Sequence, residues 1–249
     1  MGLFHYKKDA DPQWHNADVV ERGGYVYTLS EKFSTLHATN RQSDAVLSAF
    51  DYAGKKVIDI GCGDGKYTFE LWQKGHPAEL IGIDPAEEAV KVAQKKYGTA
   101  GLSFYDYNAY HIPYPDGYFD IAVVRGVIHH LDKPDQGVRE CVRVAKKLVL
   151  TDPSGYNLGV KIIEKVSPYH RAHKEMSYFP YQYRRWLVEA GAKVTKDYYI
   201  ILVPFFFPDV LAKILAKLEP MFERSRILSS MCCGTYVRIA ENQKYSENK

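Results

Sequence analysis

The feature that most constrains the fold is a ten-residue stretch at 56–65, which reads Lys-Val-Ile-Asp-Ile-Gly-Cys-Gly-Asp-Gly. Apolar residues surround a single acid, Asp59, and three glycines then alternate with Cys62 and Asp64. A short apolar run that stops at a glycine cluster is typical of a buried strand that ends in a tight turn. Residues 66–74 continue with a helical period. The stretch therefore predicts a strand, a turn whose backbone a ligand can approach closely because glycine has no Cβ, and a helix.

Strand-like and helix-like segments alternate through the middle of the chain. We predict strands at 56–60, 78–83, 102–105, 118–124 and 146–150, and helices at 36–50, 66–74, 86–97 and 134–145. This alternation is typical of a parallel sheet with helices on both faces. The predictions for the remainder are an irregular or short-helical cap at 1–35, helices at 157–166, 181–190 and 209–222, a loop at 167–180, strands at 192–202 and 233–240, and a frayed tail at 241–249.

Composition narrows the class of protein. The 249 residues suit one large α/β domain, and 46% hydrophobic content supports a full core. The 33 basic and 30 acidic residues are interspersed, which argues against a dedicated nucleic-acid binder. The four cysteines show no CxxC pair and no metal-like spacing, so we expect free thiols in a reducing compartment and no metal. No apolar run approaches about 18 residues and no secretion signal opens the chain, so we expect a cytoplasmic protein.

The glycine turn has three possible ligand classes. A dinucleotide site requires G-x-G-x-x-G, but Lys66 occupies the place of the third glycine. A P-loop requires Gly-Lys-Ser/Thr, and Tyr67 follows Gly-Lys here. The stretch closely resembles the turn of class I S-adenosylmethionine-dependent methyltransferases. The resemblance implies that S-adenosylmethionine is the cofactor and that Asp59, Gly61, Cys62, Gly63 and Gly65 lie against it.

Two further segments extend this resemblance. Asp84 and Pro85 end the second strand, where a carboxylate can accept hydrogen bonds from both ribose hydroxyls or cap the next helix. The segment 107–114 resembles the one that holds the adenine, with Asn108 accepting from the exocyclic amine and the backbone N–H of Ala109 bonding to the ring. The family often has Asp at the position of Asn108, so Asp106 remains an alternative.

The fourth strand leads into Arg-Gly-Val-Ile-His-His-Leu at 125–131. In the family that it resembles, this region lines the methionine end of the cofactor and the methyl-transfer face. Arg125 is expected under the cofactor or in a salt bridge at the sheet edge. His129 and His130 are candidate general bases or acceptor contacts, and the alternative is that both hold the loop.

The resemblance covers about residues 45–155. It is closest to the broad branch that includes ubiquinone and menaquinone biosynthesis methyltransferases. It implies a single Rossmann-like, doubly wound domain whose seven-stranded sheet is mostly parallel with an antiparallel last strand at 233–240. Residues 1–35 would form the cap, and 156–230 would form the substrate side.

Three segments are candidates for the acceptor side. The cap contributes Tyr25 and Tyr27, and the loop after 167 contributes His170. The third is the insertion at 204–222, in which an apolar stripe recurs at helical spacing, namely Val210, Leu211, Ile214, Leu215, Leu218, Met221 and Phe222. An ordinary amphipathic helix packed on the core is the first interpretation. A lid, a dimer contact or a membrane-surface helix over 209–222 are the alternatives.

The sequence thus favours a methyltransferase that acts at O or C of a small molecule. The acceptor classes that we consider are hydrophobic, isoprenoid, lipid and sugar-type molecules. An RNA or protein methyltransferase and a non-catalytic partner subunit are the alternatives. We expect a monomer or a homodimer.

Overall fold

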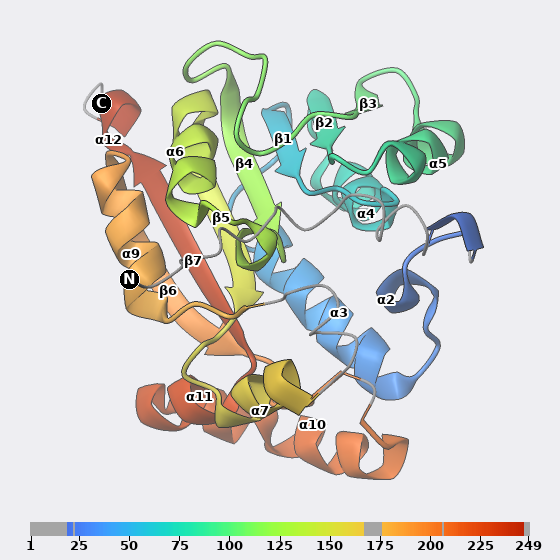
Figure 1. The fold of residues 1–249 in the computed structure, drawn as a ribbon, viewed down its shortest axis with the longest axis vertical. Helices are drawn as coiled ribbons and strands as arrows, with labels where there is room; N and C mark the ends of the chain where they lie inside the picture. The colour runs from blue at the N-terminus through green and yellow to red at the C-terminus, as the bar shows by residue number, and fades with distance from the viewer. Residues whose placement is uncertain (1–18, 22, 167–175, 206, 247–249) are drawn as a thin grey trace, which may run out of the picture.

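A single seven-stranded sheet organises the chain in the order β3-β2-β1-β4-β5-β7-β6 (Figure 1). The computed structural model describes residues 19–21, 23–166, 176–205 and 207–246. The strands are β1 Lys56–Ile60, β2 Glu79–Ile83, β3 Leu102–Tyr105, β4 Phe119–Arg125, β5 Ala145–Pro153, β6 Ala192–Ile200 and β7 Thr235–Asn242. The first five pair in parallel, and β7 runs antiparallel to both of its neighbours. The predicted Rossmann-like sheet with an antiparallel last strand is confirmed.

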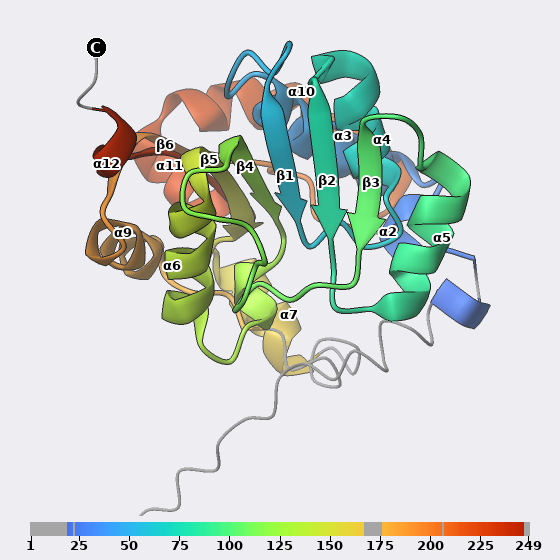
Figure 2. The same ribbon diagram turned by 90° about the horizontal axis from the view of Figure 1, so that it is seen from above.

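Helices cover both faces of this sheet (Figure 2). They are α2 Val26–Leu29, α3 Phe33–Leu47, α4 Lys66–Gly75, α5 Glu87–Tyr97, α6 Pro134–Val144, α7 Leu158–Val166, α9 Pro180–Glu189, α10 Asp209–Arg224, α11 Arg226–Cys232 and α12 Gln243–Ser246, with a 3-10 turn η1 at Ile128–His130. Apolar residues of α6 and α9 pack on one face, and those of α3, α4 and α5 pack on the other. No helix in the described ranges has the length and apolarity that crossing a bilayer requires.

Several boundaries differ from the sequence prediction, among them the helix predicted at 36–50, which is α3 at Phe33–Leu47. β5 continues past Leu150 to Pro153, because β7 pairs with it along its whole length. The predicted frayed tail is wrong at its start, where Asn242 completes β7 and donates from Nδ2 to the carbonyl of Val142 at 2.7 Å. Two short helices, α11 and α12, were not predicted. The apolar residues of α11, such as Ile227, are exposed, so the helix has no buried apolar face that the sequence could have predicted.

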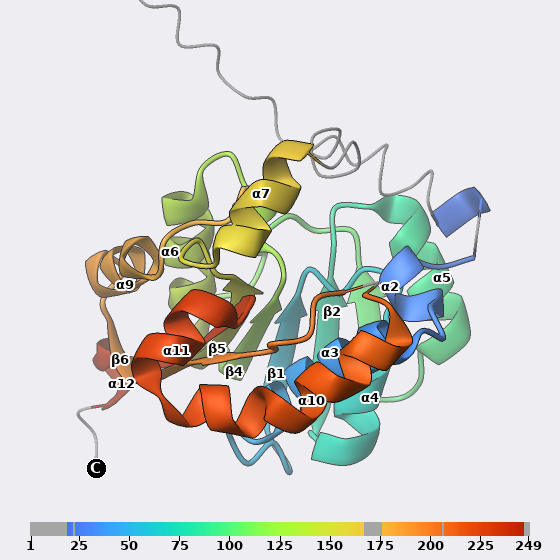
Figure 3. The ribbon, with the colours of Figure 1, turned by 90° about the horizontal axis from the view of Figure 1, so that it is seen from below.

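Helix α10 contradicts the first interpretation of its apolar stripe. The helix buries only Ala212 and Glu219, while Val210, Ile214 and Met221 are 74%, 52% and 57% exposed. Leu211 and Leu218 are also exposed, and Leu215 and Phe222 are half-buried. The amphipathic helix therefore turns its apolar stripe toward solvent, and it lies alongside α3 (Figure 3).

A buried carboxylate explains why α10 is turned this way. The Oε1 atom of Glu219 accepts hydrogen bonds from Arg41 Nε at 2.8 Å and lies 3.2 Å from His37 Nε2. Its Oε2 atom accepts from the backbone N–H of Leu202 at 2.9 Å. Arg41 also pairs with Glu223, one turn further along the helix. A carboxylate with this many donors can be buried at low cost, so the polar side of α10 is the side that docks on α3.

Candidate cofactor and acceptor site

The glycine turn lies where the cap, β1, β2 and the segment after β4 meet. The backbone N–H groups of Gly61 and Cys62 donate to the carbonyl of Ile83 at 2.7 and 3.0 Å, which ties the turn to the end of β2. Gly63 has φ of 53°, and a Cβ there would lie 2.6 Å from the ring of Tyr25. Only glycine combines this backbone conformation with so close an approach of a ring. Gly65, the third glycine of the turn, also has positive φ, at 78°.

Asp84 stands at the end of β2 with both carboxylate oxygens directed at backbone donors. Oδ2 accepts from Gly63 N at 3.0 Å, and Oδ1 accepts from Ala86 N at 2.9 Å, at the start of α5. Burial raises the pKa of Asp84 to about 6, although these two hydrogen bonds oppose the shift. Asp84 therefore fixes the turn before α5, whose N-cap residue is Ala86, and does not cap the helix itself. Each oxygen of a carboxylate can accept a second hydrogen bond, so these two bonds leave room for a diol.

Asp64 joins the cap to the glycine turn, a role that the sequence did not suggest. Its Oδ2 atom accepts from the backbone N–H of Tyr25 at 3.1 Å and from the hydroxyl of Thr28. Lys66 donates from Nζ to the carbonyl of Thr28. These bonds hold Tyr25 over Gly63. Tyr27 faces away from this contact and packs edge-on against Phe205 with ring centroids 5.3 Å apart.

The segment predicted to hold the adenine forms a tight turn. Asn108 is exposed, and its Oδ1 atom accepts from the backbone N–H groups of Tyr110 and His111 at 2.9 and 3.0 Å. These bonds fix the turn and occupy the oxygen that was expected to meet the exocyclic amine. Ala109 is buried beside it, and both Asp106 and Pro85 are exposed.

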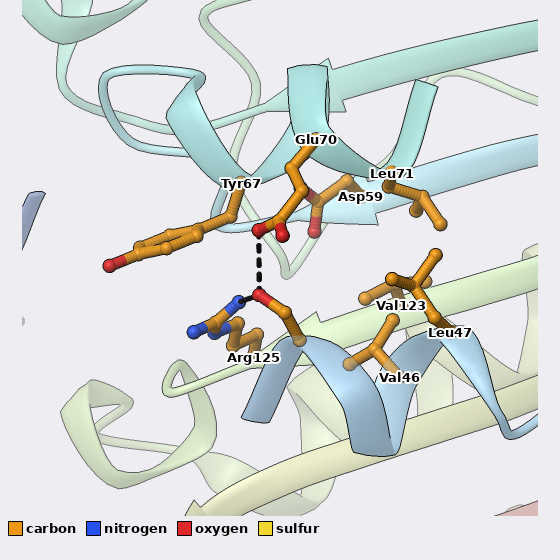
Figure 4. A pocket seen from close by; sticks show the side chains of 9 residues that line it. Val46, Leu47, Asp59, Tyr67, Glu70, Leu71, Val123 and Arg125 are labelled. Carbon is orange, nitrogen blue, oxygen red and sulfur yellow. Dashed lines mark hydrogen bonds between the residues drawn. The ribbon is translucent and has the colours of Figure 1, made fainter. Parts of the chain in front are cut away.

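Asp59 and Arg125 line one small pocket between α3, α4 and the sheet (Figure 4). Burial raises the pKa of Asp59 to about 6, opposed by the hydroxyl of Thr68, which donates to Oδ2 at 2.5 Å, and by the charge of Arg125. The Arg125 guanidinium donates to Gln42 Oε1, Ser43 Oγ and Thr39 O, and lies 3.8 Å from the ring centroid of Tyr67. These bonds attach β4 to α3, and the predicted place of Arg125 under the cofactor stays a prediction.

A histidine–carboxylate pair lies beside the carboxyl end of β4. His129 Nδ1 is 2.5 Å from Asp152 Oδ1, and Asp152 Oδ2 accepts from the backbone N–H of Ile128 at 3.2 Å. Both side chains of the pair are buried. An ionised carboxylate accepts the Nδ1 hydrogen, which makes Nε2 the proton-accepting nitrogen of the imidazole. The His129 ring faces Gly126, since Cε1 lies 3.8 Å from the position of a Cβ at that glycine.

The sequence analysis did not single out Asp152, which lies between Thr151 and Pro153 near the end of β5. The strand-ending acid was visible, but its partner is 23 residues away. His130, the other candidate base, packs against His129 with ring centroids 3.9 Å apart. His170 lies outside the described residues. Within the described part of the chain, no group of three or more His, Cys, Asp or Glu side chains is placed to hold a metal.

Comparison with known proteins identifies the core. Residues 58–149 match the family model described as "Methyltransferase domain". Over these residues the chain is similar to the methyltransferase domain of class I S-adenosylmethionine-dependent methyltransferases. The matched residues run from the middle of β1 into β5, and so include the glycine turn, Asp84, the Asn108 turn and His129. S-adenosylmethionine is the cofactor of this family.

Two curated relatives are named as O-methyltransferases. One is the ubiquinone biosynthesis O-methyltransferase of Azoarcus sp. (strain BH72), 32% identical over 123 residues, which are 47% of this chain and 51% of that protein. The other is the fatty-acid O-methyltransferase of Mycolicibacterium smegmatis, 29% identical over 151 residues, which are 61% of this chain and 53% of that protein. The chain thus spans about half the length of these two relatives.

The fold likeness extends over nearly the whole chain. The structure of magnesium protoporphyrin IX methyltransferase from Synechocystis PCC 6803 with bound S-adenosylmethionine covers 95% of this chain and 98% of its own, with a TM-score of 0.64 at 15% identity. The methyltransferase architecture therefore includes β6, β7 and the helices outside the matched core.

Proposed function

We propose that the protein transfers a methyl group from S-adenosylmethionine to a small-molecule acceptor. The observation that supports this most directly is Asp84, whose carboxylate is fixed by Gly63 N and Ala86 N at the edge of the glycine turn. A carboxylate held in this way suits the two ribose hydroxyls of the cofactor. Ala109 would meet the adenine through its backbone. Asn108 would orient this turn, because its Oδ1 atom accepts hydrogen bonds from the backbone N–H groups of Tyr110 and His111.

The methionine end of the cofactor would lie over Gly61 and near Gly126, between β1 and β4. Asp59 and Arg125 line the pocket between α3, α4 and the sheet, and from there they would set the charge near the methionine end. When bound, the cofactor supplies a methyl group on a positively charged sulfur. The chain's own tasks are to align the acceptor, to exclude water and to receive a proton.

We further propose that the acceptor atom is a hydroxyl oxygen. A protonated nucleophile needs a base, and the pair of Asp152 and His129 provides one. His129 would take the proton at Nε2, and Asp152 would act as a positioning residue by holding Nδ1–H. The printed names of the two relatives, both O-methyltransferases, agree with this choice over carbon.

Within this proposal, the acceptor class is apolar. One relative is named for ubiquinone biosynthesis and one for a fatty acid, and Tyr25 places a ring directly on the glycine turn. An RNA acceptor is less well supported, since the basic and acidic residues are nearly balanced at 33 and 30. A non-catalytic partner subunit would not need a base beside the carboxyl end of β4.

Calorimetry tests the donor assignment. S-adenosylhomocysteine, the demethylated product, should bind with a stoichiometry of about one, and NAD should give no heat of binding. Binding of NAD in its place would overturn the proposal. Radiolabelled methyl transfer to a panel of phenols, quinols and fatty acids then identifies the acceptor. A chain that binds the donor yet methylates no member of any acceptor class would support the partner-subunit alternative.

A further inference from the structure

Three helices that follow strands of the sheet expose large apolar side chains. α7 follows β5, and α10 and α11 follow β6, with α10 packed along α3. Each helix exposes at least two large apolar side chains, each more than half exposed. We call this set the apolar face: Leu158, Ile162, Ile214, Met221, Ile227 and Met231.

The three helices are neighbours, with α11 in contact with both α10 and α7 (Figure 3). α10 and α11 are separated by a single residue, Ser225, whose Oγ accepts from the backbone N–H of Leu228. Asn157, just before α7, donates from Nδ2 to the carbonyl of Cys232 at the end of α11, at 2.7 Å. A contiguous exposed patch of this kind marks an interaction site more often than scattered single residues do.

The charge around the apolar face is positive. Lys213, Lys217, Arg224 and Arg226 are all exposed along α10 and at the start of α11. The acids of α10 that could offset them, Glu219 and Glu223, are turned inward to Arg41. The other acids near these cations are Asp209, which is exposed, and Asp197, which is half-buried and lies 3.5 Å from Arg226.

The cations of α10 border its outward apolar stripe. In a helix of 3.6 residues per turn, Ile214 and Met221 lie opposite the buried Ala212 and Glu219, and Lys217 lies next to them. An apolar stripe beside a cationic flank is the pattern of helices that lie in a lipid interface. A second copy of this chain fits less well, because a two-fold contact would bring both sets of cations together.

We propose that the apolar face docks on an anionic lipid bilayer. A bilayer fits this face in two ways. The exposed apolar side chains would enter the acyl boundary, and the surrounding cations would meet the lipid phosphates. Resting on the proposed function, this docking would let the apolar acceptor reach the site from the membrane rather than from water.

Vesicle co-sedimentation of the full chain, without donor or acceptor, tests the docking. We expect binding to vesicles of phosphatidylglycerol and phosphatidylcholine, much weaker binding to phosphatidylcholine alone, and a loss of binding when ionic strength rises from about 0.05 to 0.5 M. The double variant Ile227→Ser and Met231→Ser should lower the partition coefficient by about tenfold or more. Both side chains are exposed, so the fold should tolerate the change.

A matched control separates this effect from a general loss of surface hydrophobicity. Val188 on α9 is 55% exposed and lies away from the apolar face, so Val188→Ser should leave vesicle binding unchanged. No sedimentation with either vesicle would overturn the proposal, as would equal binding by the double variant. A dimer that the double variant dissolves, without lipid binding, would assign the face to a second copy. Donor binding by calorimetry is independent of these outcomes, so failure here leaves the proposed function standing.

Discussion

The ionisation of Asp84 should control donor affinity. If the carboxylate accepts both ribose hydroxyls, only its charged form binds the donor well. Burial raises the pKa of Asp84 to about 6, so the affinity should rise with pH through about 6 and level off above about 7. With a single group of this pKa, the affinity at pH 5 should be about tenfold below that at pH 7.5. Calorimetric titration with S-adenosylhomocysteine across this range measures the effect.

Substitution provides the second half of this test. Asp84→Asn removes the charge and reduces two charge-assisted hydrogen bonds to neutral ones, a loss of about 2–3 kcal/mol, or about 30–150-fold in affinity. Glu87→Gln removes the same charge three residues away, from an exposed side chain, and should leave affinity unchanged. Equal affinity at pH 5 and 7.5, together with unchanged affinity in Asp84→Asn, would refute the ribose assignment.

Three further substitutions probe other parts of the molecule. Glu219→Ala leaves buried donors without an acceptor and should destabilise the fold by about 3 kcal/mol, lowering Tm by about 6–12 °C. The control Glu189→Gln, in an exposed pair, should change stability by less than about 0.5 kcal/mol. Thermal unfolding followed by circular dichroism compares the two variants. Asp152→Asn should lower kcat about a hundredfold and shift the pH profile, with donor affinity unchanged, while an unaltered pH profile would contradict its positioning role. Gly63→Ala should weaken donor binding at least tenfold, since the new Cβ would meet Tyr25; unchanged affinity by calorimetry would show that the ring does not need to pack there.

The spacing of apolar residues along the chain predicted the helices and strands whose formation depends mainly on neighbouring residues. β1 and β3 have the bounds that the apolar runs predicted, and the order of strands and helices is as expected. The site residues of the glycine turn and Asp84 were predicted because they adjoin strand ends. Their cofactor contacts, like the domain division, the oligomeric state and the cellular location, stay predictions.

Helix α10 shows what the sequence could not supply. Its hydrophobic period correctly predicted a helix with an apolar stripe, but periodicity cannot say which way a stripe is turned. The decision depends on Glu219, whose partners His37 and Arg41 lie about 180 residues earlier in the chain. The same reason hid the role of Asp152, since its partner belongs to another strand's loop. In both places a buried carboxylate pairs with residues far away in the sequence, and the spacing of neighbouring residues does not reveal that pairing.

Asp64 has a consequence for the order of events in turnover. Asp64 fastens the cap to the turn, so a cap that opened to admit the donor would have to break the bonds of Asp64 to Tyr25 and Thr28. Donor binding and cap closure would then be linked, each stabilising the other by the same free energy, and we would expect the donor to enter first and its demethylated product to leave last. Product inhibition would then be competitive toward the donor, and protease cleavage near Leu29 would slow when the product is bound.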